Sequence, residues 1–196
     1  MIFKIGGCRI TISYLFLAII ALAMSFDRSG ATSASLLCAA LHEAAHLTAM
    51  KAAGEFPREI CFTPFGIDIV NGNGIGESYK HDAAVSLAGP LANLAAAAVC
   101  LPVCGKQSFM FVGNAALFLL NILPIVPLDG GQALVFLLCL RMEPVKAEKI
   151  VSVISLIFLL PLAIVGFLLL LRSKWNFTLL AAACYLMALL LMKRVR

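Results

Sequence analysis

The sequence predicts an all-α polytopic membrane protein, with six transmembrane helices, the fourth of them broken, and a small β-hairpin between helices 2 and 3. Composition is the first reason: 62% of the 196 residues are hydrophobic and only 13% are charged, whereas about a quarter of the residues in soluble proteins are charged. The mean hydropathy of +1.02 agrees with this class. The second reason is the recurrence of apolar segments of membrane-spanning length. No linker, repeat or low-complexity tract marks a second domain, so we expect one domain over residues 1–196.

Six apolar segments are near or above the roughly 20 residues that cross a hydrocarbon core of about 30 Å. They lie at 10–26, 33–53, 83–104, 109–140, 149–171 and 175–192. The first follows Lys4 and Arg9, as the core of a signal peptide would. Its 17 uninterrupted residues nevertheless exceed the usual apolar core of such a peptide, so we expect this span to be retained.

Basic residues predict the orientation of the chain. If both termini are cytoplasmic, eleven of the 15 Lys and Arg residues fall inside and four fall outside, namely Arg28, Lys106, Arg172 and Lys174. Such an excess is the usual signature of cytoplasmic loops. We therefore expect an integral protein of the lipid bilayer, in a bacterial cytoplasmic membrane, with the N and C termini cytoplasmic. The basic residues form no aromatic-interleaved patch, so the net charge of +5 does not indicate a nucleic-acid partner.

The fourth apolar segment, 109–140, predicts a break at membrane depth. One straight helix would be about 48 Å long at 1.5 Å per residue, and either half would be too short to cross alone. Two prolines and two glycines interrupt helix formation here: Pro124, Pro127, Gly130 and Gly131. Irregular backbone at this depth is tolerated only where protein or a water-filled cavity surrounds it. Asp129 lies within the break, and a carboxylate there is costly unless it has a partner.

Two histidines supply a reason for that carboxylate. His42, Glu43 and His46 form a His-Glu-x-x-His pattern inside the apolar segment 33–53. Positions i and i+4 share one face of a helix, so both imidazoles can bind one metal ion while Glu43 serves as general base on a water molecule. Two His and one carboxylate leave a fourth position open, which is typical of a catalytic zinc site. We expect Asp129 to be the third ligand, because both segments run inward and place these residues at similar depths.

These motifs carry a family resemblance. The His42–His46 pattern, the Leu128–Gly131 segment (Leu-Asp-Gly-Gly) on a later broken span, and the Ala88–Asn93 segment (Ala-Gly-Pro-Leu-Ala-Asn) together resemble the site-2 protease family of intramembrane zinc metalloproteases, peptidase M50. The chain is most similar to the compact bacterial branch that includes the sporulation protease acting on a membrane-tethered sigma-factor precursor. The resemblance covers residues 5–192. It includes neither an inserted PDZ-like domain nor a CBS domain after the last span, so substrate choice and ATP control are not carried over.

The resemblance implies a zinc metalloendopeptidase that holds one Zn²⁺ per chain. His42, His46 and Asp129 would be the ligands and Glu43 the catalytic base. The expected activity is hydrolysis of peptide bonds in membrane-embedded or membrane-tethered proteins, as regulated proteolysis that releases a transcription or signalling factor. A membrane inhibitor or regulator is a further expected partner. Two alternatives stay open: a membrane metal transporter, which would not need Glu43, and a catalytically silent scaffold.

Substrate-binding residues are expected in two places. Asn93 and Asn121 are amides at membrane depth, which either join helices or orient the substrate and stabilise the oxyanion. Residues 58–70 are rich in β-branched and aromatic side chains and are followed by turn residues, which predicts the hairpin. The resemblance suggests that its strand, including Phe65, Gly66 and Ile67, binds an extended substrate segment by strand addition.

The remaining chemically active side chains receive structural interpretations. The seven cysteines are odd in number and lie mostly in spans, so we interpret them as packing residues. Cys38 lies one turn before His42 and is a minor candidate for the metal. His81, beside Asp82 at the end of a span, is expected to have an interfacial or capping role.

Overall fold

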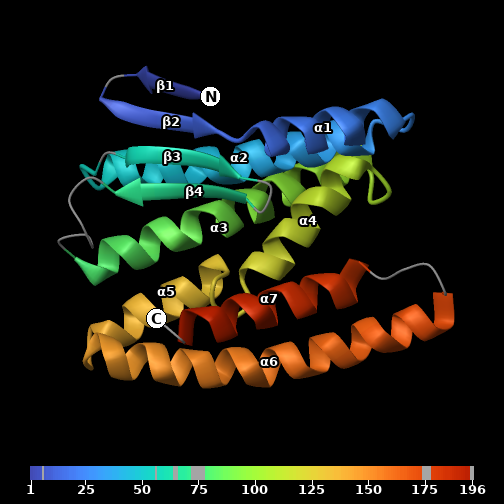
Figure 1. The fold of residues 1–196 in the computed structure, drawn as a ribbon. Coiled ribbons are helices and arrows are strands. Elements are labelled where there is room, and N and C mark those ends of the chain that lie inside the picture. The colour runs from blue at the N-terminus through green and yellow to red at the C-terminus, as the bar shows by residue number, and fades with distance from the viewer. Residues whose placement is uncertain (6, 56, 64–65, 72–77, 174–177, 195–196) are drawn as a thin grey trace. The chain divides into compact units, whose positions relative to one another are not determined.

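The computed structural model describes all of residues 1–196 except 6, 56, 64–65, 72–77, 174–177 and 195–196, and it divides into two compact units. Unit 1 is Met1–Leu119 and unit 2 is Leu120–Arg196 (Figure 1). In chain order the elements of unit 1 are β1 (Ile2–Ile5), β2 (Cys8–Ile12), α1 (Tyr14–Phe26), α2 (Ala31–Ala52), β3 (Pro57–Thr63), β4 (Gly66–Asn71), α3 (Tyr79–Cys104) and most of α4 (Phe109–Asn121). Unit 2 contains the end of α4, then α5 (Asp129–Cys139), α6 (Pro144–Ser173) and α7 (Thr178–Arg194).

A four-stranded sheet with the order β1-β2-β3-β4 opens unit 1. The hairpin expected between the second and third spans is confirmed, since β3 and β4 pair antiparallel between α2 and α3. The strands β1 and β2 were not expected from the sequence. They form an antiparallel hairpin, and β2 pairs with β3 in parallel, with Ile10 opposite Ile60. Parallel neighbours need a crossover connection, which α1 and α2 provide. The class is therefore mostly helical with a small sheet.

The predicted first span, 10–26, is wrong in its N-terminal part. Ile10 to Ile12 belong to β2, and the helix that follows, α1, covers only Tyr14–Phe26, 13 residues. Backbone hydrogen bonds explain the difference, because these residues pair with β3 and do not form the hydrogen bonds of a helix. The ring of Phe16 on α1 lies 5.7 Å from that of Phe62 on β3, which packs the helix against the sheet.

The start of α2 is fixed by a carboxylate just before it. Asp27 accepts hydrogen bonds from the Ser29 hydroxyl at 2.7 Å, the Ser29 amide at 2.9 Å and the Thr32 amide at 2.7 Å. These bonds, that from the Ser29 hydroxyl first, hold the pKa of Asp27 well below its usual range. The bond from Thr32 satisfies an amide of the first turn that the helix itself cannot. The helix that carries both histidines therefore begins at a defined residue.

The break predicted in the fourth segment is confirmed. α4 ends at Asn121 and α5 begins at Asp129, with irregular backbone between them. The unit 2 core that supports this stretch consists of buried side chains from the break, α6 and α7: Ile125, Val126, Val151, Leu159, Leu186 and Leu190. The two residues from the break are almost fully buried, at 0% and 5% exposure. The break is thus anchored by burial of its own apolar side chains.

Six transmembrane helices are not confirmed. Among the described residues, two helices are long and apolar enough to cross a membrane, Tyr79–Cys104 and Pro144–Ser173, and the other apolar helices have 10–17 residues. On α6, large apolar side chains spaced three or four residues apart are about half exposed or more, including Val153, Ile157, Ile164 and Leu168. Such a stripe suits lipid rather than water.

Candidate metal centre

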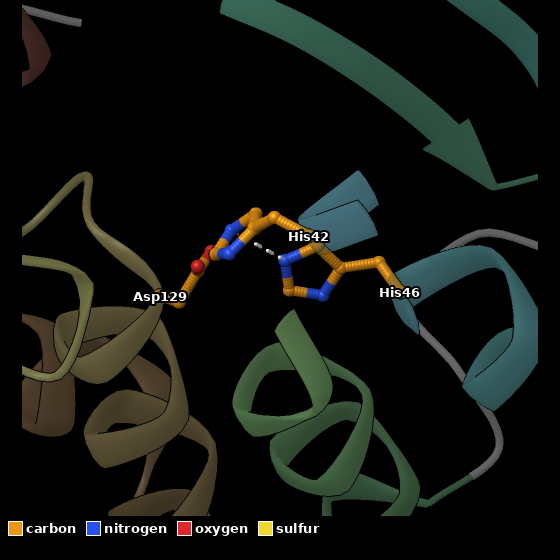
Figure 2. A group of neighbouring side chains, drawn as sticks. All are labelled: His42, His46 and Asp129. Carbon is orange, nitrogen blue, oxygen red and sulfur yellow. Dashed lines mark hydrogen bonds between the residues drawn. The ribbon is translucent and has the colours of Figure 1, made fainter. Parts of the chain in front are cut away.

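The His-Glu-x-x-His pattern lies in the middle of α2, as expected. His42 and His46 are one turn apart on one face and are both buried, with 6% and 8% exposure. Their rings meet edge to face with centroids 4.7 Å apart. Figure 2 shows this pair and also draws Asp129 of unit 2. The spacing of the motif thus produces the paired imidazoles that it predicts.

The outer nitrogens of both imidazoles are occupied by acceptors on α3. Nδ1 of His46 lies 2.8 Å from the backbone oxygen of Val85, and Nδ1 of His42 lies 2.6 Å from Oδ1 of Asn93. Neither oxygen can donate a proton, so each Nδ1 donates, and in the neutral ring each Nε2 is left with a lone pair. The two Nε2 atoms face each other at 3.1 Å.

Gly89 lets α3 approach this pair closely. A methyl group at position 89 would overlap Nε2 of His46 and would lie 2.8 Å from Nε2 of His42 and 2.7 Å from its Cε1. No side chain fits there without moving an imidazole. At Gly89, α3 thus packs against the Nε2 edges of the two rings.

Three other candidates differ in their placement. Glu43 is half-buried on α2, next to His42 in the chain. Cys38 is fully buried one turn earlier, where its Sγ lies 3.7 Å from the Met110 carbonyl on α4 and its backbone oxygen accepts from Asn93. His81 is exposed at the start of α3. These positions agree with a packing role for Cys38 and an interfacial one for His81.

In unit 2, Asp129 is the first residue of α5 and is partly buried. The backbone before it folds tightly: the Ile125 amide donates to Leu123, and the Leu128 amide donates to Ile125, each at 2.7 Å. Gln132 extends this turn, because its side-chain amide donates to the Pro127 carbonyl at 3.1 Å. These bonds set where the carboxylate begins the helix.

The two glycines after Asp129 are required by the turn. A Cβ at Gly130 would strike the carbonyl groups of Ile122 and Leu123, and one at Gly131 would strike Ile125 and the amide of Val126. Because these obstacles are backbone, they cannot move aside as a flexible side chain could. The Asp-Gly-Gly sequence therefore lets α5 begin directly against the turn that precedes it.

Ser155 of α6 ties the break to its supporting helix. Its Oγ is buried, accepts from the Val126 amide at 2.9 Å, and donates to the carbonyl of Val151 at 2.7 Å. Ser155 was not expected from the sequence, because a serine in an apolar helix gives no sign of a partner in another segment. The hydroxyl supplies the acceptor for the Val126 amide, which would otherwise be buried without a hydrogen bond.

The substrate-binding residues expected from the sequence are spread over both units. Asn93 is fully buried on α3, whereas Asn121 is partly buried at the last position of α4. Gly66 and Ile67 begin β4, which is the outermost strand of the sheet, and Phe65 lies outside the described residues. Asn114 was not expected from the sequence; it is fully buried on α4 and accepts from Asn93. A third amide in an apolar stretch was the available signal.

The histidine pair fits a transition metal. Two lone pairs facing at 3.1 Å repel each other unless a cation or a proton lies between them. Imidazole nitrogen is among the ligands that zinc prefers, and an acceptor on the second ring nitrogen is the usual partner of a metal-bound histidine. Asp129 offers a carboxylate oxygen, the other common donor type.

Comparisons with known proteins agree with the sequence motifs. Residues 105–162 match the model of Peptidase family M50, a segment that runs from the end of α3 through the break and into α6. No curated protein matches the chain. Among solved structures, the chain is similar to "Site-2 Protease from Methanocaldococcus jannaschii", with a TM-score of 0.66 and 23% identity over 95% of this chain and 91% of that one.

The two matches rest on different properties of the molecule. The sequence match covers the segment that contains Asp129, and the structural match extends over nearly the whole chain, so it includes the helix of the histidines. At the level of the family, the M50 segment supports metalloprotease character and membrane association. The resemblance of this chain to the site-2 proteases of Peptidase family M50, indicated by its motifs, is confirmed by its M50 segment and by its fold.

Proposed function

We propose that this protein is an intramembrane zinc metalloendopeptidase that hydrolyses peptide bonds of membrane-embedded or membrane-tethered proteins. The observation that carries the proposal is the pair of Nε2 atoms, 3.1 Å apart, each on a ring whose Nδ1 is already engaged by an acceptor. His42, His46 and Asp129 each offer one ligand atom, and this donor set suits one zinc ion per chain. Three protein ligands leave a position open for chemistry.

The residues divide the reaction between them. Zinc bound to this set would lower the pKa of a water molecule and polarise the scissile carbonyl. Glu43, adjacent to His42 and half-buried, accepts the proton of the attacking water and donates it to the leaving amine. Asn121, at the end of α4, is a candidate donor to the oxyanion.

An extended substrate segment would bind along β4. This strand pairs with β3 on one side and is the outermost strand of the sheet, so its other edge can accept an added strand. Main-chain hydrogen bonds would hold the substrate unwound, as hydrolysis of a helical segment requires. Gly66 and Ile67 would supply the first of these bonds.

The biological setting extends the proposal. The expected substrate is a tethered transcription or signalling factor, released by regulated proteolysis and restrained by a membrane inhibitor or regulator. The excess of basic residues on one side supports a bacterial cytoplasmic membrane protein with cytoplasmic termini. Candidate tethered factors, co-expressed with the protein and scored for cleavage, would identify the substrate.

The substitution Glu43→Gln separates this function from metal transport. The change keeps the size of the side chain but removes the proton acceptor, and lost general-base action typically lowers the rate by about 10²–10⁴-fold. Zinc content should be unchanged, because the metal ligands are intact. The measurement pairs zinc content of the purified protein with cleavage of a membrane-embedded substrate in liposomes.

Glu143→Gln provides the matched control, since it makes the same chemical change on an exposed side chain. It should cleave as the wild type does. Proteolysis by Glu43→Gln at the wild-type rate would refute the mechanism. Zinc flux in both wild type and Glu43→Gln, with proteolysis in neither, would instead support a transporter.

A further inference from the structure

We infer that Asn93 and Asn114 form a two-amide relay that sets the tautomer of His42 and thereby the zinc affinity of the site; this inference rests on the proposed function. Both asparagines are fully buried, on α3 and α4 respectively. They stand in line between the imidazole and a backbone carbonyl. Asn93 is thus a positioning residue for a metal ligand rather than a group that touches substrate.

Two backbone carbonyls determine how the amides are oriented. The Met110 carbonyl can only accept, so the atom of Asn114 that lies 2.8 Å from it is Nδ2. The carbonyl of Cys38 lies 3.2 Å from the amide of Asn93 and fixes Nδ2 of that residue in the same way. Nδ2 of Asn93 also donates to Oδ1 of Asn114 at 2.8 Å. The relay therefore has only one self-consistent direction.

That direction determines the protonation of His42. With both hydrogens of its Nδ2 donated, Asn93 presents Oδ1 to the imidazole at 2.6 Å. An oxygen acceptor at that distance keeps the hydrogen of the neutral ring on Nδ1, and the lone pair stays on Nε2, which faces His46. Asn93 also has no hydrogen left for an oxyanion, so the relay argues against the oxyanion role that the sequence allowed for it.

Asn114 acts only through Asn93. Its Oδ1 accepts from the amide of Asn93 and holds that amide in place, and its own Nδ2 donates to the Met110 carbonyl of α4. Buried partners of metal-bound histidines typically change metal affinity by about 10–100-fold when removed. Residues that act in series should show strongly non-additive effects.

The first test is zinc affinity, measured by competition with a chelator in detergent-solubilised protein. Asn93→Ala should weaken zinc binding by about 10–100-fold. Asn114→Ala should weaken it in the same direction but less, and the double variant should bind no worse than Asn93→Ala alone. Ser86→Ala is the matched control, because Ser86 is also buried on α3 but donates only to Asp82 of its own helix. It should bind zinc as the wild type does.

The second test reads the tautomer directly. The chain has three histidines, and removing exposed His81 by His81→Gln leaves two ring systems to assign by ¹⁵N spectroscopy of the zinc-free protein at mildly alkaline pH. His42 should show a protonated Nδ1 and a bare Nε2, and Asn93→Ala should lose this preference. Asn93→Asp keeps an acceptor oxygen, so it should restore the tautomer and part of the zinc affinity.

The outcomes separate this inference from the proposed function. Additive effects of the two alanine variants, or an unchanged His42 tautomer in Asn93→Ala, would overturn the relay. If Asn93→Ala does not fold, Asn114→Ala and Asn93→Asp decide the matter by the same two readings. Normal tautomer and zinc results in a protein that cleaves no membrane substrate would sustain the relay and reject the protease.

Discussion

Gly89→Ala is the most informative small change in the molecule, because it adds one methyl group at the edge of both imidazoles. The new Cβ would lie 2.8 Å from Nε2 of His42, whereas ordinary contact begins at 3.4 Å. The ring must therefore retreat by about 0.6 Å, the difference between these two distances. Metal–ligand distances tolerate only about 0.2 Å. The required displacement is about three times the tolerance.

Hydrogen bonds that hold the rings to α3 oppose this retreat. Both Nδ1 atoms are bonded to α3, at 2.6 Å for His42 and 2.8 Å for His46, so the rings cannot move back without losing those bonds. We expect zinc affinity to fall by at least about 100-fold, the upper end of what loss of a supporting partner costs. Alanine favours a helix over glycine by about 1 kcal/mol. The substitution therefore does not lower the helix propensity of α3, and weaker zinc binding could not be attributed to such a loss.

The assay is competition for zinc against a chelator, with helix content measured by circular dichroism on the same samples. Gly113→Ala is the control, because its methyl would meet only the side chain of Cys38, with Sγ at 3.1 Å and Cβ at an ordinary 3.7 Å. That thiol can rotate away, so zinc binding should stay near the wild-type value. Wild-type zinc affinity in Gly89→Ala would refute the close approach of α3 to the histidines.

Three further predictions test the other parts of the site. Asp129→Ala should lower zinc content and abolish cleavage while membrane insertion is retained; full zinc occupancy would remove Asp129 from the ligand set. Ser155→Ala should lower the free energy of unfolding by about 1–3 kcal/mol, because the buried amide of Val126 loses its acceptor. Ser152→Ala is the control, because the Ser152 hydroxyl donates to the Glu148 carbonyl of its own helix, and this variant should keep the wild-type stability. Equal unfolding temperatures of the two variants would contradict the role of Ser155. Proline at Ile67 or Ile69 removes amides that point to one edge of β4, and proline at Asp68 or Val70 removes amides that point to the other edge. Only the two substitutions on the edge facing away from β3 should impair substrate crosslinking while the sheet is kept. Unchanged cleavage and crosslinking in all four variants would exclude strand addition.

The sequence predicted the parts of the site that depend on spacing within one segment. Helical geometry alone brings His42 and His46 together four residues apart, and the structure shows them facing each other. The break before Asp129 was equally readable, since proline and glycine act on their own backbone. Both predictions therefore depended only on residues close together in the sequence.

The N-terminal hairpin shows where hydropathy misled. Arg9 and Thr11 alternate with Ile10 and Ile12, which is the period of a strand. Hydropathy does not change between this strand and the apolar helix that follows it, so the strand was predicted as the start of a membrane span. Pairing with β3, about 50 residues later, is what separates them. A pairing partner at that distance cannot be read from the composition of the segment itself.

The supporting groups of the histidines were hidden for a different reason. His46 is oriented by a backbone carbonyl, and every residue has one, so nothing in the identity of Val85 marks its role. Asn114 was readable only as one amide among several in apolar helices, because its meaning depends on which side chain lies opposite. Ligands are specified by what they are, whereas their supports are specified by where the fold places them. Variants at Gly89, Asn93 and Asn114 therefore test the packing of α2, α3 and α4 more sharply than variants of the ligands, whose loss would remove the metal however the helices were arranged.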